Sequence, residues 1–202
     1  PARGIDGSFV TANSNVTGDR AFWQMKIALN VAAIGCRGPE ETTLVSAYNN
    51  IIKTHGKTIR STEKNVISQL GKETRTNGTA ARDKLSTQLF NYFAQPPAQR
   101  DFCPRANEVA QLVASTPSAQ IVEQAPTHLA RLNQPFLDFY EAYAKYQSDA
   151  VAWDAKYAPP PPIMSTPAPM APVGPTNAPG TMRVVPATTT NSNWRAASSG
   201  FK

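Results

Sequence analysis

The sequence predicts an all-α protein: a bundle of five to six helices with an extended N-terminal arm and a proline-rich, extended C-terminal tail. Apolar residues recur at helical spacing through residues 20–157, and no segment there clearly alternates apolar and polar residues as a half-buried strand would. Residues 1–19 are mostly small or polar, which is typical of an extended arm. Ten of the 18 prolines fall in residues 158–202, a composition that cannot build a core.

The first helix of the body is predicted over residues 21–34, where nearly every face is apolar. A helix of this character must be covered on most of its sides. We therefore expect it at the centre of the bundle. Its larger apolar residues are Phe22, Trp23, Met25, Ile27, Leu29, Val31 and Ile34.

The next segments carry amphipathic patterns separated by helix-breaking signals. Pro39 opens a second helix whose first turn is acidic, which the helix dipole favours. Gly56 interrupts the apolar stripe, so that either one helix bends there or two helices meet. Asn77-Gly78 predicts a turn, after which Thr79 can cap a further helix.

Prolines are expected to divide the rest of the body. Pro104 fits the first turn of a helix that stops near Pro117, and Pro126 is expected to break the short segment that follows. The last helix is predicted to begin with Asn133 as its N-cap and Pro135 in its first turn.

This last helix has the clearest pattern in the chain. Its apolar residues follow one another at spacings of 4, 3, 4, 3, 4, 3 and 4, which is the repeat of a coiled-coil seam. One interpretation is that this seam closes the bundle. The other gives part of it to a partner, with Trp153 and Tyr157 facing outward because they lie nearest the tail. The seam consists of Leu132, Phe136, Phe139, Tyr143, Tyr146, Ala150, Trp153 and Tyr157.

Two cysteines, Cys36 and Cys103, lie 67 positions apart, each at the expected end of a helix. They can form a disulfide bond or remain unrelated buried thiols. A disulfide favours an exported protein, in the periplasm or at the cell surface. The start of the sequence at Pro1 fits the removal of a secretory leader.

The tail, residues 158–202, favours polyproline II structure, at about 3.1 Å per residue. It is either a disordered linker or a strap that lies in a groove of another subunit. A pure spacer needs no large apolar side chains, and this tail has them at long intervals. We therefore interpret it as a strap. Its expected partner-binding residues, together with Trp153 and Tyr157 of the last helix, are Ile163, Met164, Met170, Met182, Val184, Val185, Trp194 and Phe201.

No motif in the sequence points to a catalytic or metal site. The chain contains no phosphate-binding loop, dinucleotide fingerprint, HExxH or GxSxG motif, and two cysteines with two histidines do not make a zinc signature. We interpret His55 and His128 as capping or packing residues. The net charge of +6 is not gathered into a basic patch, so no nucleic-acid partner is expected, and no segment has the ~18 apolar residues that cross a membrane. No cofactor and no small-molecule substrate is indicated.

Four short segments of the body form a recognisable set: Ala28-Leu29-Asn30-Val31-Ala32-Ala33-Ile34-Gly35-Cys36, Ala47-Tyr48-Asn49, Tyr92-Phe93-Ala94-Gln95-Pro96-Pro97 and Phe102-Cys103. With these segments the chain resembles a set of exported helical proteins of unknown function from sphingomonad-type Alphaproteobacteria. The resemblance covers about residues 25–145 and leaves out the tail. It implies an exported α-helical fold that keeps both cysteines, and it supplies no activity or site.

The sequence therefore favours a non-catalytic accessory subunit of a larger cell-envelope or extracellular assembly. It would be attached to neighbouring protein subunits through the tail and the aromatic end of the last helix. The alternative is a free periplasmic ligand-binding module that uses the tail as a tether. A third hypothesis is an enzyme whose active site has no recognisable sequence motif.

Overall fold

The computed structural model describes residues 1–157 of the chain. Within these residues it contains six α-helices and one short 3₁₀ helix, so the predicted all-α fold of five to six helices is confirmed for this part of the chain. The proline-rich tail lies outside the described residues. The helices are α1 (Gly18–Gly35), α2 (Glu41–Thr54), α3 (Gly56–Thr74), α4 (Gly78–Phe93), η1 (Pro96–Ala98), α5 (Gln99–Ser115) and α6 (Ile121–Tyr157).

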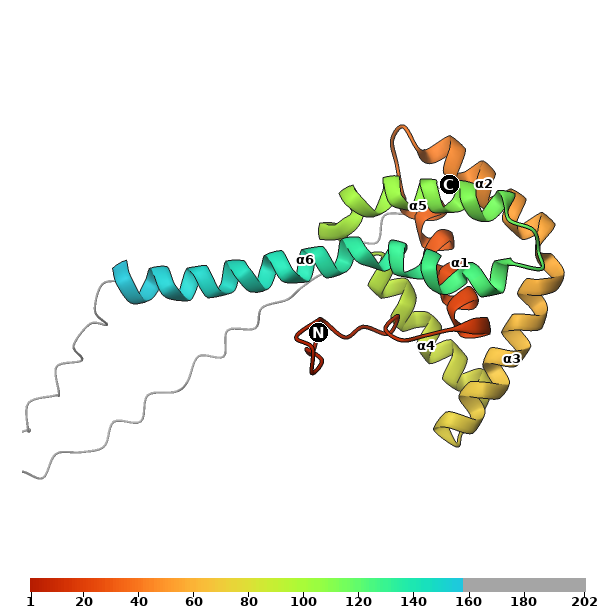
Figure 1. Ribbon diagram of the computed structural model, residues 1–202, viewed down its shortest axis with the longest axis horizontal. Coiled ribbons are helices and arrows are strands. Elements are labelled where there is room, and N and C mark those ends of the chain that lie inside the picture. The colour runs from red at the N-terminus through yellow and green to blue at the C-terminus, as the bar shows by residue number, and fades with distance from the viewer. Residues whose placement is uncertain (158–202) are drawn as a thin grey trace, which may run out of the picture. The chain divides into compact units, whose positions relative to one another are not determined.

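Helix α1 lies at the centre of the bundle, as its composition predicts. It contacts each of the other five α-helices (Figure 1). Ten of its 18 residues are buried, among them Phe22, Met25 and Leu29, which are almost completely shielded from solvent. Burying a side chain of this size stabilises the fold by about 1.5–3 kcal/mol. The apolar residues of α1 are thus covered by neighbouring helices on most sides, except Ile34 near its end, which is exposed.

A cluster of phenylalanines joins the three C-terminal helices of the bundle. The rings of Phe93, Phe102 and Phe136, from α4, α5 and α6, are fully buried. Their centroids are 5.1–5.8 Å apart, within the range for favourable aromatic pairs. The cluster fixes the middle of α6 against the end of α4 and the beginning of α5.

The break at Gly56 separates two helices. Helix α2 ends at Thr54 and α3 begins at Gly56, with His55 as the single residue between them. The His55 side chain is buried, and its Nδ1 lies 2.8 Å from the Ser118 hydroxyl in the loop between α5 and α6. This contact fits the packing role expected for His55. At the next turn, the cap of α4 is Asn77 and not Thr79, because the Asn77 side chain accepts hydrogen bonds from two backbone N–H groups of the first turn.

The predicted proline breaks are wrong at three positions. Pro104 lies inside α5, and α6 continues without interruption through Pro126 and Pro135. Asn133 therefore lies within α6 and does not cap it. A proline in a helix interior costs about 3 kcal/mol. Here that cost is offset by packing, because α6 buries a row of apolar residues on both sides of each proline: Ile121, Ala125, Leu129, Leu132 and Phe136.

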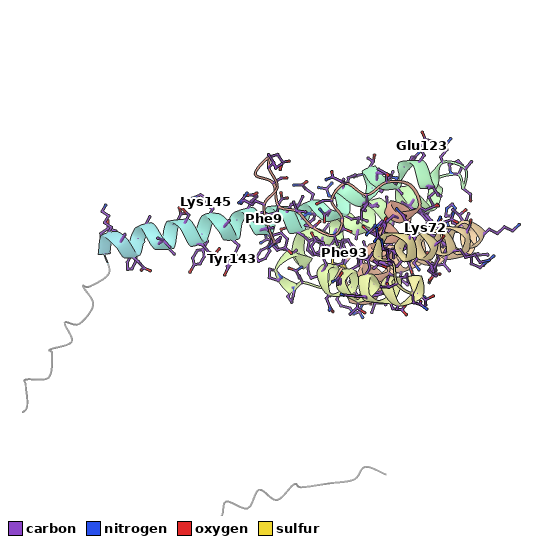
Figure 2. The ribbon with its side chains drawn as sticks, turned by 90° about the horizontal axis from the view of Figure 1, so that it is seen from below. Phe9, Lys72, Phe93, Glu123, Tyr143 and Lys145 are labelled. Carbon is purple, nitrogen blue, oxygen red and sulfur yellow. A yellow bond between two sulfur atoms is a disulfide. The ribbon has the colours of Figure 1, made fainter. Side chains whose placement is uncertain are left out.

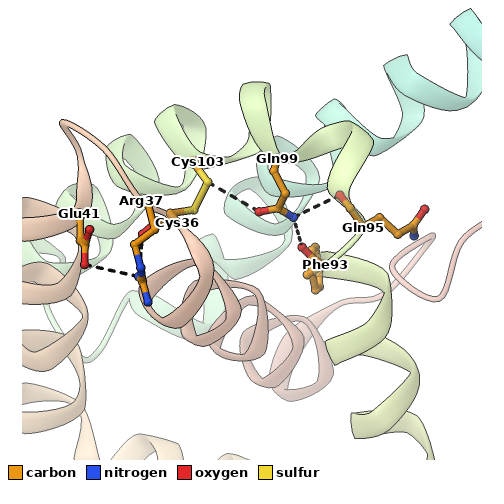
Figure 3. The surroundings of a disulfide bond; sticks show 7 residues. All are labelled: Cys36, Arg37, Glu41, Phe93, Gln95, Gln99 and Cys103. Atoms are coloured by element: carbon orange, nitrogen blue, oxygen red, sulfur yellow. Dashed lines mark hydrogen bonds and ion pairs between the residues drawn. A yellow bond between two sulfur atoms is a disulfide. The ribbon is translucent and has the colours of Figure 1, made fainter.

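The two cysteines form a disulfide bond, as one of the two sequence-based alternatives expected. Cys36 follows the last residue of α1, and Cys103 lies in the second turn of α5 (Figure 3). Beside it, Gln99 donates hydrogen bonds from Nε2 to the backbone oxygens of Phe93 and Gln95, which holds η1 against the start of α5. The disulfide thus ties the end of the central helix to the α4–α5 junction.

Replacing both cysteines by serine is expected to lower the free energy of unfolding by about 4 kcal/mol. The bond links residues 67 positions apart and so reduces the conformational entropy of the unfolded chain. Urea denaturation followed by circular dichroism measures this loss. Reduction of the wild-type protein serves as the control and should give the same shift. A loss below about 1 kcal/mol would contradict the role assigned to the bond.

Two glycines offer a matched pair of substitutions. A Cβ atom at Gly78 would overlap the backbone oxygen of Ile67 in α3, whereas a Cβ atom at Gly35 meets nothing within 4 Å. We expect Gly78→Ala to lower the free energy of unfolding by about 1–3 kcal/mol through overpacking, and Gly35→Ala to raise it by up to about 1 kcal/mol. Urea denaturation of both variants tests this, and effects of the same sign would contradict it.

Candidate interaction surface at the end of α6

Helix α6 is much longer than the bundle that holds its first half. It has 37 residues, about 55 Å of helix, whereas the other α-helices have 14–19. Leu132 and Phe136 are fully buried, and Phe139 and Tyr140 are partly buried. From residue 141 to 157 the side chains are exposed, apart from two partly buried alanines. We call residues 141–157 the projection (Figure 1).

The coiled-coil seam therefore divides into two parts. Up to Phe136 it closes the bundle, which was the first interpretation of the pattern. From Tyr143 onward it faces solvent, which extends the outward-facing segment well beyond the expected Trp153 and Tyr157. The seam tyrosines and the tryptophan of the projection are 50–66% exposed, although large aromatic side chains are usually buried to a greater extent.

These aromatic side chains form a continuous ridge along one side of α6. Tyr143 stacks on Phe139 with a centroid separation of 6.0 Å, and Tyr146 follows at 6.4 Å. Trp153 and Tyr157 form a second pair at 5.5 Å. Ala150 lies between the two groups and interrupts the aromatic surface with a small side chain. We call these six residues, Phe139, Tyr143, Tyr146, Ala150, Trp153 and Tyr157, the ridge.

Charged residues of the projection lie beside the ridge and on the opposite side of the helix. Lys145 pairs with Asp149 at 2.6 Å, one helical turn further on, and Lys145 and Tyr143 point to opposite sides of the helix in Figure 2. The Lys156 ammonium lies 5.0 Å from the centroid of the Tyr157 ring, a cation–π distance. The projection is thus amphipathic, with an aromatic side and a charged side.

The N-terminal arm supports the base of the projection. Helix α1 begins at Gly18, so the arm comprises residues 1–17, and its backbone folds back in an isolated bridge between Arg3 and Phe9. Arg3 donates two hydrogen bonds to the Glu141 carboxylate, both 2.9 Å long, and its guanidinium also lies 4.0 Å from the Phe9 ring centroid. Phe9 meets the Tyr140 ring edge to face at 5.6 Å (Figure 2). The hydrogen bonds from Arg3 hold the pKa of Glu141 below its usual value.

A second polar contact, centred on Asn133, attaches the other end of the arm. The Asn133 Oδ1 atom is buried and accepts hydrogen bonds from the Tyr92 hydroxyl at 2.7 Å, from Asn13 Nδ2 at 3.1 Å and from the Thr11 hydroxyl at 3.4 Å. Burial raises the pKa of Tyr92, so its hydroxyl stays protonated and remains a donor. Arm, α4 and α6 are thus joined at one acceptor. No local sequence pattern predicts this function of Asn133, and the one signal for it is a polar residue inside an apolar stripe.

The eight tail residues expected to bind a partner, Ile163, Met164, Met170, Met182, Val184, Val185, Trp194 and Phe201, lie outside the described residues. Trp153 and Tyr157 are the only two of the ten expected residues that the described part of the chain contains, and the structure places them together at the end of the ridge.

In the described part of the chain, no group of three His, Cys, Asp or Glu side chains could hold a metal ion. His128 is buried, and its desolvation, with a smaller effect of nearby Arg131, lowers its pKa. Among residues 1–157, no helix is both long enough and apolar enough to cross a membrane.

Comparisons of the chain with protein families, with curated proteins and with solved structures found no match.

The contact between Arg3 and Glu141 predicts the protease sensitivity of the arm. Trypsin must take the Arg3 guanidinium into its own specificity pocket, so the ion pair should slow cleavage after Arg3. We expect Glu141→Gln to speed this cleavage severalfold at neutral pH, measured by mass spectrometry as loss of residues 1–3. Asp138→Asn is the control, because Asp138 lies on α6 but bonds to Gln134 and not to the arm.

Acid should release the same contact. Because the folded-state pKa of Glu141 is lowered, the contact is complete at neutral pH and is lost only as the pH falls through that lowered value, beneath the ordinary range of a glutamate. In an NMR titration, the Glu141 carboxyl carbon and the Val10 amide, which bonds within the arm, should share this midpoint. Independent midpoints, or unchanged cleavage in Glu141→Gln, would contradict this account of the arm.

Proposed function

We propose that this protein is a non-catalytic structural subunit of a larger cell-envelope or extracellular assembly. It attaches to neighbouring subunits through the ridge of α6 and through the proline-rich segment that follows it. The observation that carries the proposal is the projection, a helix of 17 residues that stands clear of its own bundle with an aromatic side exposed.

The energetics of the projection support a partner. Isolated helices of this length are marginally stable in water, and most helices in proteins are stabilised by packing an apolar face. The ridge has such a face, and the bundle does not cover it. A row of contiguous aromatic side chains on a water-exposed surface is typical of an interaction site.

The disulfide supports an extracytoplasmic location, because such bonds persist in oxidising compartments. We accordingly propose that the protein is exported, in the periplasm or at the cell surface. The proline-rich segment, residues 158–202, directly follows the last residue of α6 in the sequence. We propose that both belong to one attachment element. Prolines restrict the unbound chain and reduce the entropy lost when such a segment is ordered on a partner.

One observation favours the second candidate, a ligand-binding module. A groove of about 640 Å³ lies between the arm and α6, lined by Phe9, Val10 and Leu137 among others. The Asn13 side chain lines this groove, and its Oδ1 atom is buried without a hydrogen-bond partner. Most of the groove, however, is formed by the arm itself and has a mixed polar and apolar lining, whereas small-molecule sites are enclosed and mainly apolar.

The proposal is tested by extracting the protein from its native cells at low salt and following its size by gel filtration. We expect the full chain to migrate with a large particle. Truncation after Ala158, and separately the double variant Trp153→Ser/Tyr157→Ser, should release it at the monomer mass of 21.8 kDa or, for the truncation, below it.

Leu112→Ser is the matched control, because Leu112 is an exposed apolar residue on α5, away from the projection. This variant should stay with the particle. If the full chain and the truncated chain both run as monomers, the structural role is wrong, and the groove beneath the arm becomes the site to test with ligands.

A further inference from the structure

The ridge has the geometry of one helix of a coiled coil, and this geometry indicates which kind of helix can pair with it. The inference rests on the function proposed above. From Phe139 to Tyr157 the ridge residues are spaced 4, 3, 4, 3 and 4 apart, so they occupy the core positions of a heptad repeat. A coiled-coil core requires a second helix with a matching stripe. The question is which helix fits this one.

The shape of the ridge suits a copy of itself. Its side chains are large except at Ala150, which leaves a recess between Tyr146 and Trp153. Core layers of a coiled coil pack well when a large side chain faces a small one. A second copy running in the opposite direction can place its Trp153 in the recess at Ala150 and accept the first copy's Trp153 in its own recess.

The charges beside the ridge select the direction of the partner helix. The positions that flank the core near the recess are Gln147, Asp149, Asp154 and Lys156. In a parallel pair in register, Asp149 would face the partner's Asp154 on both sides of the interface, which is repulsive. In the antiparallel pair centred near the recess, Asp149 faces the partner's Lys156, also twice, which is attractive.

The same antiparallel register satisfies the remaining flanking groups. Gln147 faces the partner's Asp154, to which its amide can donate a hydrogen bond, and Tyr146 faces the partner's Tyr157 in the core. If the two helices overlapped by one more heptad, Asp149 would face the partner's Asp149, which is repulsive. An overlap longer by a second heptad would require the partner's Trp153 to pack on Phe136. That residue is fully buried in its own bundle and is not accessible.

We propose that the ridge pairs with the ridge of a second copy of this chain, antiparallel, with Trp153 of each copy in the recess at Ala150 of the other. The paired segment covers residues 146–157, about 18 Å of helix, so the dimer is weak on its own. Each projection then points toward the bundle of the other copy.

The charge of the projection argues against a lipid surface as the partner. Residues 141–157 contain three acidic and two basic side chains, so the projection has no excess of positive charge. Helices that bind anionic membranes carry an excess of Lys and Arg on their polar side.

Charge exchange between the two facing positions tests the pairing in the purified full chain. Sedimentation equilibrium over a wide concentration range should show a wild-type monomer–dimer equilibrium. Asp149→Lys and Lys156→Asp should each raise the dimer dissociation constant about tenfold, because two attractive pairs become repulsive. An equimolar mixture of the two variants restores both pairs in a mixed dimer, and should associate as the wild type does.

Lys145→Glu is the control. Like Asp149→Lys, it breaks the ion pair between Lys145 and Asp149, but Lys145 lies away from the core-flanking positions, so association should be unchanged. Circular dichroism checks that all variants remain folded. A parallel pair would respond in the opposite way, because Asp149→Lys would then face the partner's Asp154 and strengthen association.

Three results would overturn the proposal: a wild-type chain that stays monomeric up to millimolar concentration, a mixture that associates no better than its components, or binding to phosphatidylglycerol vesicles by a chain that remains monomeric. If the purified chain is monomeric but still migrates with a large particle in native extracts, the second-copy partner is wrong while the structural role stands. If the purified chain dimerises but migrates with nothing larger in native extracts, the structural role is wrong while the pairing with a second copy stands.

Discussion

The structure depends on the burial of α1 on most of its sides. An almost uniformly apolar helix is stable in water only when other helices surround it, and α1 contacts each of the five others. Each of those helices therefore needs only one apolar stripe, and its opposite face can carry charge. The phenylalanine cluster of α4, α5 and α6 and the disulfide from the end of α1 to α5 then fix the helices around this centre.

A bundle built around one helix of 18 residues can support its neighbours only over about 27 Å. Helix α6 is twice that length, and its second half extends beyond the bundle. The arm meets α6 at this boundary, through Arg3 on Glu141 and through Asn13 and Thr11 on Asn133. These contacts reinforce α6 where it leaves its neighbours, and they set the direction in which the aromatic ridge is presented.

Properties that follow from local patterns were predictable. The helical class, the central position of α1 and the pairing of the cysteines could be inferred from composition and spacing. The proline breaks were not predicted correctly, because the local cost of Pro126 and Pro135 is outweighed by tertiary packing of α6 on α1. The arm contacts join residues more than 100 positions apart, which no short pattern reveals. The seam itself was visible, but the point where it passes from core to solvent depends on where the neighbouring helices end.

The position of the disulfide has a mechanical consequence. The bond links residue 36 to residue 103, so α2, α3 and α4 form a closed covalent ring, whereas the arm, α1 and α6 lie outside it. Tension applied between the two ends of the chain passes from α1 across the sulfur atoms to α5 and α6, and bypasses the ring. The ring withholds about 230 Å of extended chain that a reduced molecule would release under load. A chain pulled at both ends therefore lengthens far less before it breaks than a reduced chain would.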